Sequence, residues 1–114
     1  MIQFKRIYED YSETDGYRIL IDRLWPRGIS KERAMIDLWI KEIAPSNDLR
    51  KWYSNNSGNT SEFQKRYLTE LKNNADSLKK IKKILKNHET ITLLSASKDT
   101  NPVHNFVLKK VLKE

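Results

Sequence analysis

The sequence predicts an α/β fold, a single layered domain over residues 1–114 in which a small, mostly parallel sheet is flanked by helices. Two segments, 17–22 and 90–96, carry the consecutive bulky aliphatic side chains expected of strands buried on both faces. Helical patterns separate these two segments, and such a crossover joins parallel neighbours in the right-handed sense. An apolar content of 38% is sufficient for one modest core.

The first part of the chain is expected to contain two strands. Residues 2–8 alternate apolar and polar side chains, which is typical of a strand with one wet face. Residues 9–16 are acidic and polar and predict a turn before the buried strand at 17–22. That strand must end near Trp25, because the following proline cannot donate a backbone hydrogen bond and Gly28 permits a tight turn.

Two serines are expected to cap the next helices. Ser30 caps a short helix at 31–35, and Ser46 opens another that continues through Trp52. The segment 36–44 fits a strand and a helical stripe equally well, and we favour a short extended segment that ends at the following proline.

The second half predicts two amphipathic helices, a strand and a last helix. A Ser/Asn/Gly loop at 54–60 precedes helices at 61–73 and 76–86, whose apolar side chains recur with helical spacing. After the strand at 90–96, Asn101 and the proline that follows it predict the start of a helix that runs to the C-terminus.

The composition limits the chemistry and the location. The absence of cysteine excludes disulfides, thiolate metal sites and thiol nucleophiles, and the two histidines do not predict a metal site. No cofactor is expected, since the chain has no P-loop or dinucleotide-binding glycine motif. With no signal peptide and no membrane-spanning apolar run, we expect a cytoplasmic protein that does not enter a membrane.

Positive charge is concentrated in the second half of the chain. The formal net charge is +7, with 10 basic and 9 acidic residues up to position 57, and 12 basic and 6 acidic residues after it. This asymmetry favours an anionic partner, whether a phosphate ester, a carboxylate or a nucleic acid.

Two strand exits are the predicted functional site, because ligands of parallel sheets bind outside the carboxyl ends of the strands. The first exit offers Arg23 and Arg27, whose guanidinium groups suit phosphate or carboxylate oxygens, with Trp25 between them as an apolar platform. The second offers hydroxyl groups, Lys98, Asp99 and a helix start that favours an anion. If the two exits are adjacent, they form an anion pocket. Equally, the arginines could pair with nearby acids and Trp25 could simply pack a corner.

Asp22 and His104 are the candidates for proton transfer, together with Asp99. Asp22 directly follows the buried strand, where desolvation without a partner would raise its pKa; it could be a general base or could form a structural salt bridge to an arginine. His104 is placed on the apolar arc of the last helix and should point inward and be neutral, as an acid, a base, a ligand or a hydrogen-bonded core residue.

Two other surfaces suggest other roles. The lysine-rich helix at 76–86 is a candidate nucleic-acid or regulatory-protein interface, although its lysines and its leucine and isoleucine residues lie on separate faces, as in an ordinary solvated helix. Trp39, Trp52 and Tyr53 could form an apolar patch for self-association, so we expect a monomer or a weak homodimer.

Several motifs in this order closely resemble the YeaO-like members of the family known as domain of unknown function 488. They are 17–32 (YRILIDRLWPRGISKE), 37–46 (DLWIKEIAPS), 49–52 (LRKW), 92–99 (TLLSASKD) and 104–105 (HN). The resemblance implies a small cytoplasmic bacterial α/β domain without an established activity. Ser95 and Ser97 stand where relatives often carry other small or aromatic residues, which argues against a hydroxyl nucleophile there. The family signature positions that match are Asp22, Arg23, Trp25, Pro26, Arg27, Gly28, Trp39, Lys41, Pro45, Trp52, Asp99, His104 and Asn105.

Together these features predict a domain that binds a small anion and leave open whether it is an enzyme. Arg23 and Arg27 would hold the phosphate or carboxylate and Trp25 would pack the ligand. The remaining candidates for ligand contacts or proton transfer are Asp22, Lys41, Lys98, Asp99, His104 and Asn105.

Overall fold

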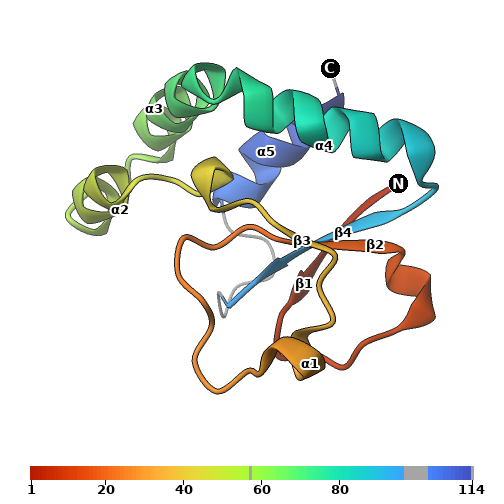
Figure 1. The fold of residues 1–114 in the computed structure, drawn as a ribbon. Coiled ribbons are helices and arrows are strands. Elements are labelled where there is room, and N and C mark those ends of the chain that lie inside the picture. Colours follow the sequence, from red (N-terminus) through yellow and green to blue (C-terminus); the bar gives the residue numbers. More distant parts are fainter. Residues whose placement is uncertain (57, 97–102, 114) are drawn as a thin grey trace.

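The computed structural model describes residues 1–56, 58–96 and 103–113, and it contains a four-stranded parallel sheet with its main helical layer on one face (Figure 1). The strand order is β1-β4-β2-β3, so the two strands predicted to be buried lie side by side in the centre. The strands are β1 (Ile2–Arg6), β2 (Tyr17–Leu20), β3 (Leu38–Trp39) and β4 (Ile91–Ser95).

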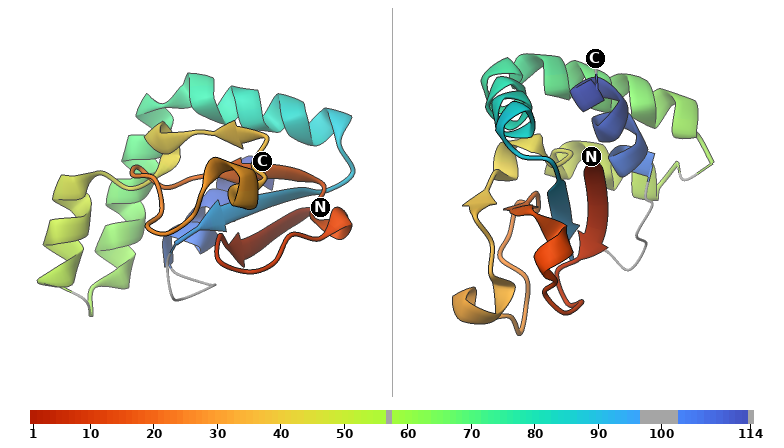
Figure 2. Two further views of the ribbon diagram at one scale, coloured as in Figure 1. Left: turned by 60° about the horizontal axis from the view of Figure 1, so that its bottom comes forward. Right: turned by 90° about the vertical axis from the view of Figure 1, so that its right-hand side faces the viewer.

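The helices follow the predicted segments closely and lie mostly on one side of the sheet. Figure 2 shows α1 across the sheet from α3, α4 and α5. Within the described residues, no helix is long and apolar enough to cross a membrane. The helices are α1 (Lys31–Ala34), α2 (Asn47–Ser54), α3 (Thr60–Asn73), α4 (Ala75–Asn87) and α5 (Val103–Lys113), with 3₁₀ turns η1 (Glu13–Asp15) and η2 (Lys41–Ile43).

The alternation of side chains along β2 and β4 divides the core into two parts. Ile19 and Leu93 belong to the larger cluster, which includes the inward faces of α3, α4 and α5. Their neighbours Leu20 and Leu94 belong to a smaller cluster with Ala34 of α1 on the opposite face. This period of two is the geometry of a strand, and it explains why every residue of β4 is buried.

The two predicted serine caps are confirmed. The hydroxyl of Ser30 accepts a hydrogen bond from the backbone N–H of Arg33, and that of Ser46 accepts one from Leu49. The ambiguous segment 36–44 is partly extended, as favoured, but it contains only the two-residue strand β3 before η2. The predicted cap at Asn101 lies outside the described residues.

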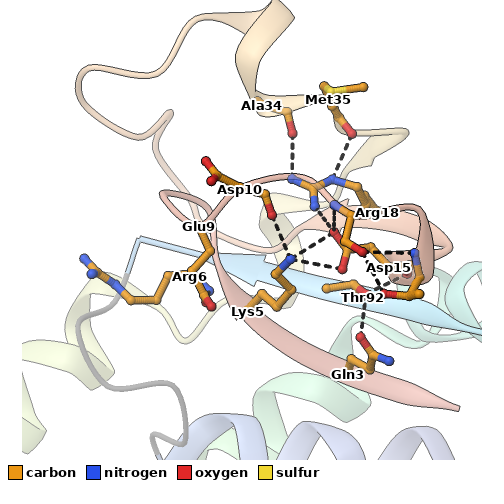
Figure 3. A network of polar contacts seen from close by, with 12 residues as sticks. Gln3, Lys5, Arg6, Glu9, Asp10, Asp15, Arg18, Ala34, Met35 and Thr92 are labelled. Atoms are coloured by element: carbon orange, nitrogen blue, oxygen red, sulfur yellow. Dashed lines mark hydrogen bonds and ion pairs between the residues drawn. The ribbon is translucent and has the colours of Figure 1, made fainter.

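A buried ion cluster on the face that α1 covers was not predicted (Figure 3). The carboxylate of Asp15 receives Lys5 Nζ at 3.0 Å and the guanidinium of Arg18, and Asp15 and Arg18 are each only 1% exposed. Arg18 also donates to the backbone carbonyls of Ala34 and Met35 at the end of α1. The cluster therefore attaches the end of α1 and the η1 turn to the sheet.

The pKa of Asp15 reflects this environment. Burial raises it, but hydrogen bonds from Lys5 and from the Ser12 backbone, the charge of Lys5 and the hydrogen bond from Arg18 outweigh burial, and the pKa is lowered from its ordinary value of 3.8. The carboxylate is thus the ionised partner that balances two cations in a place with little water.

Candidate functional site

The two predicted strand exits meet in one cleft of about 570 Å³. This adjacency follows from the sheet, because the carboxyl ends of the parallel neighbours β2 and β4 lie at the same edge. The start of α2 and the first turn of α5 complete the walls. The lining residues are Tyr8, Asp22, Arg23, Leu24, Trp25, Pro26, Arg27, Asn47, Arg50, Ser95, Ala96 and His104.

Asp22 connects the two exits. Its Oδ1 accepts a hydrogen bond from the Ser95 hydroxyl at 2.8 Å, and its Oδ2 accepts one from the backbone N–H of Ala96 at 2.7 Å. The side chain is half-buried. Among the described residues, the alternative that Asp22 forms a salt bridge to an arginine is wrong. The ion pairs in this part of the chain are those that Asp15 forms with Lys5 and Arg18.

Arg23 proves to be a structural tether. Its Nε donates to the carbonyl of Pro45 at 3.0 Å, and one terminal nitrogen donates to the carbonyl of Ala44 at 2.8 Å. The half-buried guanidinium therefore fastens the exit of β2 to the segment that leads into α2. The alternative that this arginine pairs with a nearby acid does not hold among the described residues, where its guanidinium donates to backbone carbonyls instead.

Trp25 both packs a corner and lines the cleft. Its indole N–H donates to the carbonyl of Ile29 at 2.6 Å, and its ring meets that of Trp39 edge-on with centroids 5.6 Å apart. The Trp39 N–H in turn donates to the backbone carbonyl of Asp22. These contacts hold the loop that bears Arg27 in one shape, which a binding site on a loop requires.

Arg27 and Arg50 contribute two exposed guanidinium groups to the lining of the cleft. Both side chains are exposed and line the cleft, and within the part of the chain that the structure describes neither guanidinium has a hydrogen bond or an ion pair. Around Arg27 the backbone is fixed, since the Tyr8 hydroxyl donates to its carbonyl at 3.0 Å.

Arg50 was not predicted as a site residue, although it stands within the 49–52 motif. It lies four residues after the Ser46 cap, so it projects from the first turns of α2, and only the tertiary placement of α2 beside the strand exits brings it to the cleft. The cap itself was the available signal, since the start of a helix directs free N–H groups and positive charge outward.

His104 lies where the cleft meets the core. It is half-buried, lines the cleft and contacts the edge of the Tyr67 ring, with centroids 6.2 Å apart. Its neighbour Asn105 is 5% exposed, and its Oδ1 has no hydrogen-bond partner among the described residues. Asn105 is not one of the residues that line the cleft, so the two members of the predicted pair occupy different environments.

One described residue that was predicted to contact a ligand, Lys41, does not line the cleft. Lys41 is exposed and its ammonium group lies over the Trp39 ring, 5.6 Å from the centroid, outside the lining. Lys98 and Asp99 lie outside the described residues.

The predicted apolar patch is not formed as expected. Trp52 and Tyr53 are half-buried against the core, and the guanidinium of Arg66 covers the Trp52 ring at 4.1 Å. Trp39, by contrast, is 38% exposed at the edge of the sheet. A second hollow lies between α3 and α5, lined by four apolar side chains, two lysines, a serine and a glutamine, and it contains none of the predicted site residues.

The fold and the cleft define a small parallel α/β domain with an arginine-lined opening at its strand exits. The chain belongs to the domain of unknown function 488 family, as its resemblance indicated: the family model described as "Inactive DUF488-N3 subclade" matches residues 1–114.

The chain is also similar to curated bacterial proteins over nearly its whole length. It is 43% identical to the uncharacterized protein YeaO of Escherichia coli, over 94% of this chain and 92% of that protein. It is 36% identical to the uncharacterized proteins Rv3073c of Mycobacterium tuberculosis and Mb3100c of Mycobacterium bovis, over 97% of this chain and 92% of each of them. No solved structure matches the chain.

Proposed function

We propose that this protein is a binding domain for small anions, and that Arg27 and Arg50 hold the phosphate or carboxylate of the ligand. The observation that carries the proposal is the position of these two guanidinium groups, unpaired within the described residues, in the cleft where the strand exits meet. A planar guanidinium binds two oxygens of one anion, so two of them supply both affinity and orientation.

The charge of the cleft supports the same proposal. Three arginines and one carboxylate line it, and the positive end of α2 adds to the field at Asn47. A volume of about 570 Å³ lies within the usual range for small-molecule sites, roughly 300 to 1,000 Å³. A metabolite-sized anion therefore fits this opening in both charge and size.

Binding is favoured over catalysis. The family model that matches the chain describes its members as an inactive subclade. Asp22, which was a candidate base, already accepts hydrogen bonds from Ser95 and Ala96, so those contacts fix its position between the strand exits. The arrangement suits a protein that binds an anion.

Calorimetric titration with inorganic phosphate and with acetate tests the proposal. We expect binding of at least one anion by the wild-type protein, and about a tenfold loss of affinity in each of the variants Arg27→Ala and Arg50→Ala, the loss of one charged hydrogen-bonding group. Arg33→Ala is the matched control, because Arg33 is exposed on α1 and does not line the cleft. Equal weakening by the control variant, or no binding of either anion, would contradict the proposal.

A second candidate function uses α4, whose outward lysines Lys79, Lys80, Lys83 and Lys86 are all exposed. This surface suits a polyanion such as a nucleic acid, bound through its backbone charge. A fluorescence titration with single-stranded and duplex DNA at two salt concentrations tests it. Binding that persists unchanged from low to high salt would rule out this lysine-driven mode.

A further inference from the structure

The carboxylate of Asp22 sets a condition on any ligand of the arginine-lined cleft. A bare anion bound by Arg27 and Arg50 would share the cleft with a negative charge that, among the described residues, no cation pairs. Like charges in a partly desolvated site repel each other. The adjacent guanidinium does not neutralise Asp22, because Arg23 is directed to the carbonyls of Ala44 and Pro45.

The same carboxylate retains capacity for a ligand. An ionised carboxylate accepts about four hydrogen bonds, and each oxygen of Asp22 accepts one, from the Ser95 hydroxyl and from the Ala96 N–H. These two donors are neutral, come from β4 and its exit, and hold the half-buried group in one orientation. Asp22 is therefore a positioned acceptor at the wall of the cleft.

We infer that the ligand is a small organic anion that also carries a hydroxyl or amino hydrogen-bond donor, and that Asp22 accepts this donor while Arg27 and Arg50 hold the anionic group. The inference rests on the proposed anion-binding function and names the class of its ligand. Part of the cleft wall is apolar and is formed by Leu24, Trp25 and Pro26; Leu24 is 81% exposed. The carbon skeleton that joins the two polar ends of the ligand can pack against these side chains.

Two matched pairs of probes test this by calorimetry. Glycerol 3-phosphate and propyl phosphate differ by two hydroxyl groups, and glycerate and propionate form the corresponding carboxylate pair. We expect the hydroxylated member of one pair to bind about tenfold more tightly, the contribution of one hydrogen bond to a charged group. The pair that shows the preference tells whether the anionic group is a phosphate or a carboxylate.

The variant Asp22→Asn should change the affinities for the two members of a probe pair in opposite directions. The amide can keep both anchors, since its oxygen accepts from Ala96 and its N–H₂ donates to the Ser95 hydroxyl, which accepts as readily as it donates. Removal of the charge should tighten propyl phosphate or propionate and remove most of the tenfold preference for the hydroxylated partner.

Equal affinity within both pairs of probes, measured on the wild-type protein and thus independent of any variant's folding, overturns the inference while anion binding stands. A preference that survives Asp22→Asn overturns the role of Asp22. If none of the four probes binds, the proposed function itself fails, and the inference fails with it.

Discussion

Arg23 and Arg27 are two signature arginines of the same strand exit, yet the structure gives them different contacts, and a stability measurement separates the two residues. Arg23→Ala removes two hydrogen bonds from a charged donor, at 3.0 Å to Pro45 and at 2.8 Å to Ala44. Each such bond contributes about 1.5 to 3 kcal/mol. Since the Arg23 side chain is only half-buried, we expect a total loss of about 3 kcal/mol, the lower end of the range for two such bonds.

Urea denaturation followed by the fluorescence of the three tryptophans measures this difference. Arg27→Ala is the paired variant, and it should alter the free energy of unfolding by no more than about 0.5 kcal/mol, because its side chain is exposed and has no partner among the described residues. If Arg23→Ala unfolds at the wild-type urea concentration, or if Arg27→Ala is the more destabilised variant, the assignment of Arg23 as the structural tether is refuted.

Three further changes test the scaffold by thermal or urea denaturation. Asp15→Asn leaves the buried Arg18 and the half-buried Lys5 without their anion and should cost about 3 kcal/mol or more; a loss under about 1 kcal/mol would count against the ion cluster. Because the folded pKa of Asp15 is below 3.8, its contribution is complete above that value and should disappear as the pH falls through the lowered pKa, a step that the variant lacks. Gly16 has a φ of +65°, and Gly16→Ala would place a Cβ against the carbonyl oxygen of Thr90, so this variant should lose at least about 2 kcal/mol of stability. Wild-type stability of the variant would contradict this backbone conformation of Gly16. Tyr67→Phe removes a buried hydroxyl hydrogen bond of 2.7 Å and should cost about 1 to 2 kcal/mol; no loss would mean that water replaces it.

Much of the fold could be predicted because it depends on local signals. The aliphatic runs of β2 and β4 require burial on both faces, and a serine before a helix satisfies free N–H groups whatever lies around it. The segment after α1 was harder, because the two residues of β3 form a strand only through pairing with β2. Such a short edge strand depends on tertiary contact more than on its own sequence.

The adjacency of the two strand exits was predictable, but the contacts of the residues there were not. The rule for parallel sheets pointed to both exits, and Asp22, Arg23, Trp25 and Arg27 line the cleft where the exits meet. It could not show that Arg23 would donate its hydrogen bonds to backbone carbonyls of a distant segment. Nor could it show that α2 would place Arg50 in the cleft. Both facts depend on how α2 packs, which no local pattern specifies.

The buried ion cluster shows the same limit more strongly. Arg18 lies within a buried strand, and the sequence does not indicate its partners, because Asp15 precedes it in a turn and Lys5 belongs to another strand. Their meeting depends on the order of the strands in the sheet. A charged side chain is tolerated in a core only when an opposite charge or a hydrogen-bonding group lies beside it. Which group lies there is decided by the tertiary fold.

A crystal structure with glycerol 3-phosphate bound tests the central claim most directly. We expect the phosphate within hydrogen-bond distance of the guanidinium groups of Arg27 and Arg50, with a hydroxyl group donating to Asp22. A phosphate bound to the lysines of α4 with the arginine-lined cleft empty would contradict the account.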